Sequence, residues 1–260
     1  MRVVTYFHPY SFGIWDNAKS RKEDNLMNRL WITLLFTVVG SDILLGQSKN
    51  KEAERLEASA RVFQEIMDTP DSAIPNELLS RCECISIIPS MKKGGFIVGG
   101  RYGKGAVSCR KGNGKGPWGP PAMITVEGGS FGLQIGGAAV DVVMLFMDKD
   151  GVSSLLKDKF TLGADASAAA GPVGRDATAG TDVLMKAKIL SYSRSRGAFA
   201  GLELKGAVVK QDKEGNRTLY GKDVDPKDLV LAAKEAIPRD AQPLIQILTK
   251  YAPVRQKKPL

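Results

Sequence analysis

The sequence predicts an α+β protein with a single domain, in which a curved, mainly antiparallel sheet or small barrel is flanked by N-terminal and C-terminal helices. Strand-like apolar runs fill the middle of the chain, whereas an amphipathic helical stretch at 49–69 precedes them and a short helical stretch at 241–251 follows them. The glycine pairs Gly128–Gly129 and Gly136–Gly137 interrupt the most apolar run, as glycines do where a long strand bends. No internal repeat is visible, and strands enclosed by terminal helices favour one domain.

Residues 1–46 form a leader. Within it, an uncharged apolar run at 30–41 is short for a membrane span, but it is typical of a signal peptide when a basic residue precedes it. We therefore expect a signal peptide at 27–46, with Met27 as an alternative start of the chain and Gly46 next to the cleavage site. The protein would then be exported, periplasmic or secreted, and peripherally associated with a membrane. An uncleaved membrane anchor is the alternative.

The first helix is expected at 49–69, because Leu56, Phe63 and Met67 recur at the spacing of one helical face. Two interpretations of this face stay open. It packs on the protein's own core, or it docks into a membrane interface. A second, short helix is expected to begin at Pro75, since proline is favoured in the first turn.

Residues 81–116 predict a hairpin, because apolar runs flank a turn from Pro89 to Gly95. No acidic residue lies between Glu83 and Glu127, and the whole chain of 260 residues has a formal net charge of +9. Such a basic stretch predicts an anionic partner. Its cations are Lys92, Lys93, Arg101, Lys104, Arg110, Lys111 and Lys115.

The rest of the chain predicts more strands and a helical end. A Gly/Pro loop at 112–121 contains Trp118, and a long bent strand is expected at 122–147. After it we expect a helix at 152–159, a small-residue segment at 160–182, strands at 186–194, 197–204 and 206–211, a hairpin turn at 212–216 followed by a short strand at 217–220, a helix at 225–236 capped by Asp225, a helix at 241–251 and a basic tail at 253–260.

Residues for catalysis are scarce. The one histidine, His8, lies in the leader, which excludes Ser-His-Asp and Cys-His catalysis and a histidine metal site. Cys82 and Cys84 are too close in one strand to form a good disulfide with each other, and with Cys109 they are too few for a zinc site. We interpret all three as small buried residues. We expect no enzyme activity, no cofactor and no metal.

Several ordered motifs give the chain a resemblance to a known family. They are Ile74–Pro75, KKGG at 92–95, GGRYGKG at 99–105, W-x-x-P at 118–121, GGSFGLQ beginning at 128 and SRSRGAFAGL at 193–202. Over residues 50–252 the chain resembles the SYLF domain, whose family includes fungal and animal cortical-actin and endocytic proteins and many exported bacterial members. The absence of SH3 or FYVE modules and the signal segment are typical of a bacterial exported member.

The resemblance implies phospholipid binding, with a preference for phosphoinositides in eukaryotic members, and actin binding and bundling in fungal ones. Together with the basic stretch it predicts a non-enzymatic domain that binds anionic phospholipid headgroups. The alternative is a protein-interaction module that binds actin or an envelope partner. Nucleic acid is not expected, because the aromatic residues do not interleave with the basic ones. The expected headgroup contacts are Lys92, Lys93, Arg101, Lys104 and Lys115, with Trp118 as an interfacial anchor.

Overall fold

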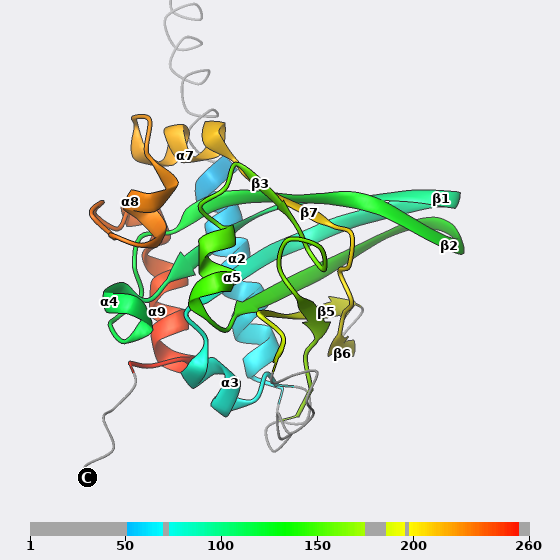
Figure 1. The fold of residues 1–260 in the computed structure, drawn as a ribbon, viewed down its shortest axis with the longest axis horizontal. Helices are drawn as coiled ribbons and strands as arrows, with labels where there is room; N and C mark the ends of the chain where they lie inside the picture. Colours follow the sequence, from blue (N-terminus) through cyan, green and yellow to red (C-terminus); the bar gives the residue numbers. More distant parts are fainter. Residues whose placement is uncertain (1–50, 70–72, 175–185, 196–197, 255–260) are drawn as a thin grey trace, which may run out of the picture. The chain divides into compact units, whose positions relative to one another are not determined.

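A long two-stranded ribbon, with helices packed around one end of it, dominates the computed structural model (Figure 1). The structure describes residues 51–69, 73–174, 186–195 and 198–254, so the predicted leader and signal peptide lie outside the described residues. The helices are α2 (Lys51–Met67), α3 (Asn76–Arg81), α4 (Lys111–Gly114), α5 (Lys149–Ser154), α7 (Lys213–Tyr220), α8 (Pro226–Val230), the 3₁₀ helix η1 (Arg239–Ala241) and α9 (Gln242–Tyr251). The strands are β1 (Cys84–Cys109), β2 (Ala122–Phe146), β3 (Lys159–Thr161), β4 (Ala168–Ala170), β5 (Ile189–Ser195), β6 (Ala198–Gly201) and β7 (Val208–Gln211).

The sheet has the strand order β3-β7-β2-β5-β4, and it is antiparallel except between β4 and β5. β1 pairs with β2 along nearly its whole length, and β6 pairs with β5. The two ends of β2 serve different neighbours, since Ile124–Glu127 pairs with β7 and Asp141–Phe146 pairs with β5. A strand that long can join both halves of the sheet only if it curls, which confirms the expected curved, mainly antiparallel sheet.

The ribbon of β1 and β2 folds back on itself. Its regular pairing is interrupted between Ile88 and Met91 and again between Gly95 and Ile97. The first and last residues of β1, Cys84 and Cys109, consequently meet with their Cα atoms 4.0 Å apart and form a disulfide. The prediction that all three cysteines are only small buried residues is therefore wrong for this pair. Residues 91–102 of β1 and 128–140 of β2, here called the ribbon tip, extend beyond the helices (Figure 1).

Side chains alternate between two apolar cores on the two faces of the ribbon. Ile85 and Val143 belong to the core that is shared with α2, α3 and α9. Ile88 and Val142 belong to the other core, which α5, α8 and the disulfide complete. Near the disulfide both faces of the sheet are covered, and the ribbon tip projects from this covered base.

The predicted elements are confirmed where a local period or cap determines them. The first helix, the long bent strand at 122–147, the Asp225 cap and the last helix are all present. The turn from Pro89 to Gly95 is wrong, because β1 continues through it as an irregular strand. The turn at 212–216 and strand at 217–220 are also wrong, since this segment is α7. Among the described residues, no helix is long and apolar enough to cross a membrane.

Candidate functional site

Three of the predicted cations lie together at the ribbon tip. Lys92, Lys93 and Arg101 line an open hollow of about 550 Å³, together with Gly94, Gly100, Tyr102, Ala138 and Ala139. This set is called the basic hollow. β1 runs out through the two lysines and returns through Arg101, so one strand supplies all three cations. None of the residues that line the hollow is acidic.

The cations of the basic hollow lack a carboxylate partner among its lining residues. Burial, and then the positive charge of Arg101, lower the pKa of Lys93. The Arg101 guanidinium donates to the Gly129 carbonyl at 3.2 Å, which fixes its position without neutralising its charge. Like charges held close together raise the local positive potential, and a bound anion would relieve this repulsion.

Tyr102 adds an aromatic ring beside these cations. Its side chain is 47% exposed, which makes it one of the few large apolar residues at the surface of the described chain. Sequence reasoning missed this residue, although it lies inside the GGRYGKG motif. The signal was available, since an aromatic side chain next to arginine in a basic stretch is typical of binding surfaces.

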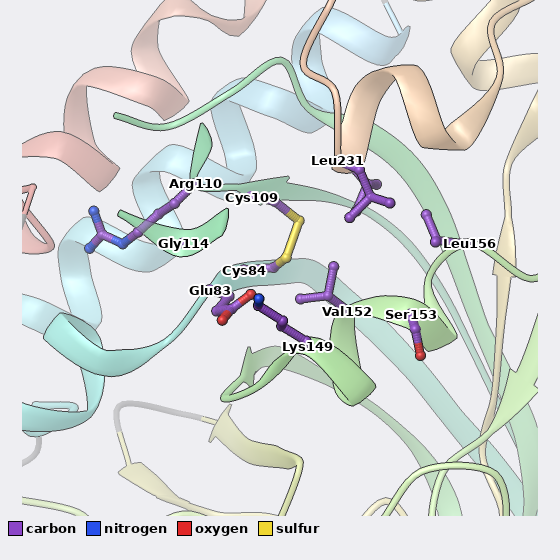
Figure 2. Close-up of a pocket in the computed structure, with 11 residues that line it drawn as sticks. Glu83, Cys84, Cys109, Arg110, Gly114, Lys149, Val152, Ser153, Leu156 and Leu231 are labelled. Atoms are coloured by element: carbon purple, nitrogen blue, oxygen red, sulfur yellow. A yellow bond between two sulfur atoms is a disulfide. The ribbon is translucent and has the colours of Figure 1, made fainter. Parts of the chain in front are cut away.

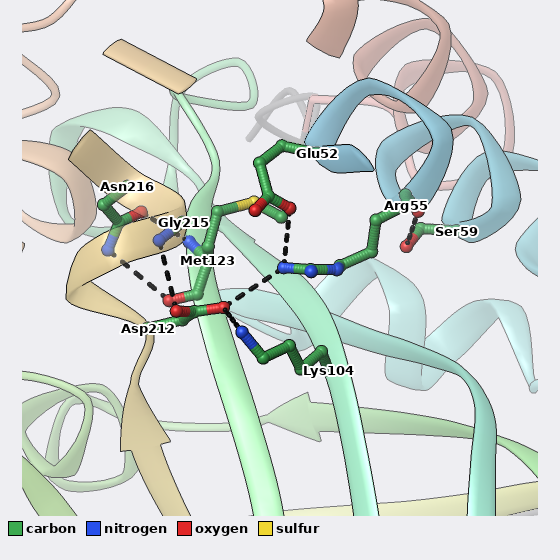
Figure 3. Close-up of polar contacts among 8 residues, drawn as sticks. All are labelled: Glu52, Arg55, Ser59, Lys104, Met123, Asp212, Gly215 and Asn216. Carbon is green, nitrogen blue, oxygen red and sulfur yellow. Dashed lines mark hydrogen bonds and ion pairs between the residues drawn. The ribbon is translucent and has the colours of Figure 1, made fainter. Parts of the chain in front are cut away.

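Lys104 has a different role from the predicted one. Its Nζ donates to Asp212 Oδ2 at 2.9 Å, and Arg55 from α2 reaches the same oxygen at 3.2 Å (Figure 3). Burial opposes ionisation of Asp212, but the hydrogen bonds from Lys104 and from the Gly215 N–H outweigh it and lower the pKa of Asp212. Lys104 thus joins α2 and α7 to the sheet, and the expectation of a headgroup contact is corrected.

Lys115 and Trp118 lie away from the ribbon tip. Lys115 is exposed directly after α4, next to the base of the ribbon. Trp118 is 2% exposed, its indole N–H donates to the Ala252 carbonyl at 3.0 Å, and the Arg110 guanidinium lies 4.3 Å from its ring centre. Trp118 packs in the core and presents no ring to a membrane interface, so its assignment as an interfacial anchor is corrected.

The apolar face of α2 is also buried. Leu56 and Phe63 are fully covered, and Met67 is 3% exposed. Of the two interpretations left open, the structure shows this face packed on the protein's own core. In this fold it is not available for docking into a membrane.

A second cavity lies beside the disulfide. It has a volume of about 270 Å³ and is enclosed by α5, α8 and the ends of β1 (Figure 2). Val152, Leu156 and Leu231 give it an apolar wall, and its charged lining residues are Glu83, Arg110 and Lys149. This cavity therefore mixes both signs of charge, whereas the lining of the basic hollow is basic without an acidic residue. No cluster of residues suited to a metal is found among the described residues.

Fold and site together define a class: an α+β domain built on a folded-back ribbon with a basic tip. A family model described as "Las17-binding protein actin regulator" (Ysc84) matches residues 127–251. The chain therefore carries a domain of the SYLF family, to which the Ysc84 proteins belong. That description is of an actin regulator and not of an enzyme.

Curated relatives agree with the family model. SH3 domain-containing protein PJ696.02 of Schizosaccharomyces pombe is 35% identical over 178 residues, which are 67% of this chain and 40% of that protein. Protein YSC84 of Saccharomyces cerevisiae is 32% identical over 185 residues, 70% of this chain and 39% of that protein. SH3 domain-containing YSC84-like protein 1 of Homo sapiens is 32% identical over 203 residues, 77% of this chain and 58% of that protein. The chain thus spans less than two thirds of the length of these relatives.

Proposed function

We propose that this chain is a non-enzymatic protein-interaction module that binds actin filaments through its ribbon tip. The observation that carries the proposal is the basic hollow, in which the exposed Lys92 and the half-buried Lys93 and Arg101 line an open surface without an acidic lining residue. The family description as an actin regulator supports this partner. The relatives' own partners, such as the one printed in the name LAS seventeen-binding protein 3, concern longer proteins.

The hollow has the composition of a protein-binding surface. Arginine and tyrosine are the residue types that most often dominate binding energy, and here Arg101 and Tyr102 are neighbours at the end of a projecting ribbon. Complementary charge raises the association rate and selects acidic partners over basic ones. The strongest effect is therefore expected on specificity and on the salt dependence of binding.

Co-sedimentation with actin filaments tests the proposal. The variant Lys92→Glu/Lys93→Glu should weaken binding by at least about tenfold, because two favourable charge contacts become repulsive. The matched control is Lys157→Glu/Lys227→Glu, which makes the same charge change at two exposed lysines away from the hollow. Equal loss in both variants, or no filament binding by the unmodified chain, would overturn the proposal.

Anionic phospholipid is the second candidate partner, and two observations favour it. Tyr102 lies exposed beside the cations, as aromatic rings do at membrane interfaces, and each basic residue near an anionic surface contributes about 1 kcal/mol. In addition, the Cys84–Cys109 disulfide is a bond that persists in oxidising compartments, where actin is absent. Flotation with phosphatidylglycerol vesicles should then show salt-sensitive binding. Equal binding to phosphatidylcholine vesicles would exclude this candidate.

An exported location goes with the phospholipid candidate. The disulfide and the apolar run at 30–41 support it. Cell fractionation with N-terminal sequencing and thiol labelling tests it. A mature chain that begins after Gly46, with Cys84 and Cys109 oxidised, is the expected result. A reduced, uncleaved cytosolic chain would reject export and leave actin as the partner.

A further inference from the structure

β1 contains a bulge immediately before the two lysines of the basic hollow. Ile88 pairs with Val142 and Met91 pairs with Val140, so two β1 residues face the single β2 residue Asp141. These two residues are Pro89 and Ser90. A bulge of this kind bends the strand and leaves backbone groups without ladder partners.

Asp141 supplies the partner that the bulge lacks. Pro89 has no N–H, and the Ser90 N–H donates to Asp141 Oδ1 at 2.9 Å. Ser90 has a φ of 50°, in the left-handed region that a residue with a Cβ rarely adopts. Such a conformation persists only where surrounding contacts enforce it, and the Asp141 carboxylate is one of those contacts.

The second oxygen of Asp141 is held from the opposite side. Arg194 of β5 is its register partner across the sheet, and it donates to Asp141 Oδ2 from Nε at 3.1 Å and from Nη2 at 2.8 Å. The remaining nitrogen, Nη1, pairs with Glu65 of α2. The side chains of Asp141 and Arg194 are only 16% and 23% exposed, so solvent screens this pair less than it screens a surface pair.

We infer that Asp141 is a positioning residue, which sets the direction in which the ribbon tip leaves the sheet and so places Lys92 and Lys93 at the basic hollow. One carboxylate connects the bulge of β1 to β5 and, through Arg194, to α2. The lysines follow Ser90 by two and three residues, so a change at the bulge is transmitted directly to them. The link to binding rests on the proposed function of the ribbon tip.

The sign of the change in partner binding distinguishes a positioning role of Asp141 from an effect of its charge. Removing a carboxylate near a basic surface makes that surface more positive, which by itself strengthens binding of an anionic partner. Loss of positioning weakens binding instead. The variant Asp141→Ala should therefore bind actin filaments about tenfold more weakly although its charge is more favourable, which corresponds to about 1.4 kcal/mol.

Hydrogen exchange tests the positioning without any partner. In Asp141→Ala, amides 90–94 should exchange about tenfold faster than in the unmodified chain, while amides 142–146 at the base of the ribbon stay unchanged. Asp141→Asn keeps an oxygen that can accept from the Ser90 N–H, and it should restore most of the protection. The control Asp150→Ala removes a carboxylate from the exposed pair with Lys188 and should leave amides 90–94 unaffected.

Filament binding and hydrogen exchange test different claims, so a negative result in one does not decide the other. Unchanged exchange at 90–94 in Asp141→Ala would overturn the positioning role, whatever the chain binds. Stronger filament binding by this variant would show that the carboxylate acts only through its charge and would also overturn the role. If the unmodified chain binds no filaments, the proposed partner is wrong, and the exchange data still decide on Asp141. Asp141→Ala is also compared with the unmodified residue in a Ser90→Gly background, because glycine adopts the positive φ of position 90 without strain. In that background the loss of the carboxylate should speed exchange at 90–94 by less than about tenfold, and an undiminished effect would overturn the positioning role.

Discussion

The disulfide at the base of the ribbon predicts a large, measurable contribution to stability. Cys84 and Cys109 are 25 residues apart in sequence, and their bond closes the whole of β1 into a loop. In the chain-entropy treatment, closing a loop of this length removes enough freedom from the unfolded chain to stabilise the fold by about 3.5 kcal/mol at 25 °C. For a domain of this size, that corresponds to a fall of about 7–14 °C in Tm when the bond is removed.

Urea unfolding of the variant Cys84→Ala/Cys109→Ala, monitored by circular dichroism, measures this contribution. The control is Cys82→Ala, which removes a buried thiol that donates to the Leu79 carbonyl but leaves the loop closed. It should lose only about 1 kcal/mol, the cost of a small cavity. Adding a reductant should destabilise the unmodified chain and the control, and should leave the double variant unchanged.

Counting thiols gives an independent check. In the unfolded, unreduced chain one cysteine of the three should react with a maleimide, and all three should react after reduction. Three reactive thiols before reduction, or equal stability of the double variant and the Cys82→Ala control, would refute the reasoning. In either case the fold-back of the ribbon would be maintained by packing alone.

Three further predictions concern stability. Asp212→Asn should cost about 2 kcal/mol at pH 7. Because the folded pKa of Asp212 is depressed, its contribution is present above the unfolded value near 3.8 and is lost as the pH falls through the folded pKa. The difference between the urea midpoints of variant and unmodified chain should therefore shrink as the pH is lowered below 3.8. Trp118→Phe should cost about 1–3 kcal/mol by calorimetry, with unchanged filament binding. Gly105→Ala would place a Cβ 2.1 Å from the Ile87 carbonyl oxygen and should cost about 1–3 kcal/mol, whereas Gly129→Ala meets open space and should shift Tm little.

Local patterns predicted much of the fold. The spacing of Leu56, Phe63 and Met67 predicts the buried face of α2, and the apolar run at 122–147 with its paired glycines predicts the long strand β2. α7 could not be found this way. Its first residues have the composition of a hairpin turn, but Asp212 caps the helix at the Gly215 N–H and binds Lys104 and Arg55, which are distant in sequence.

Prediction of the site was limited by the same long-range contacts. Of the cations in the acid-free run, Lys92, Lys93 and Arg101 line one hollow, because they lie on one strand and its return. Their role as partner contacts stays a prediction. Lys104 belongs to the same run, but an acidic residue far along the chain neutralises it. Trp118 lies in a Gly/Pro loop whose composition is typical of a surface. It is buried because the chain near Ala252 packs on it and the Ala252 carbonyl accepts its indole N–H, a contact that is distant in sequence.

A hydrogen-exchange footprint of the chain bound to actin filaments tests most directly whether the ribbon tip is the binding surface. Exchange should slow at amides 92–94 and 100–102, and at Ala138 and Ala139, which together line the basic hollow. Amides of α8, on the other side of the disulfide, should exchange at the same rate with and without filaments. Slowed exchange confined to α8, or to the exposed side of α2, with an unchanged ribbon tip would contradict the account.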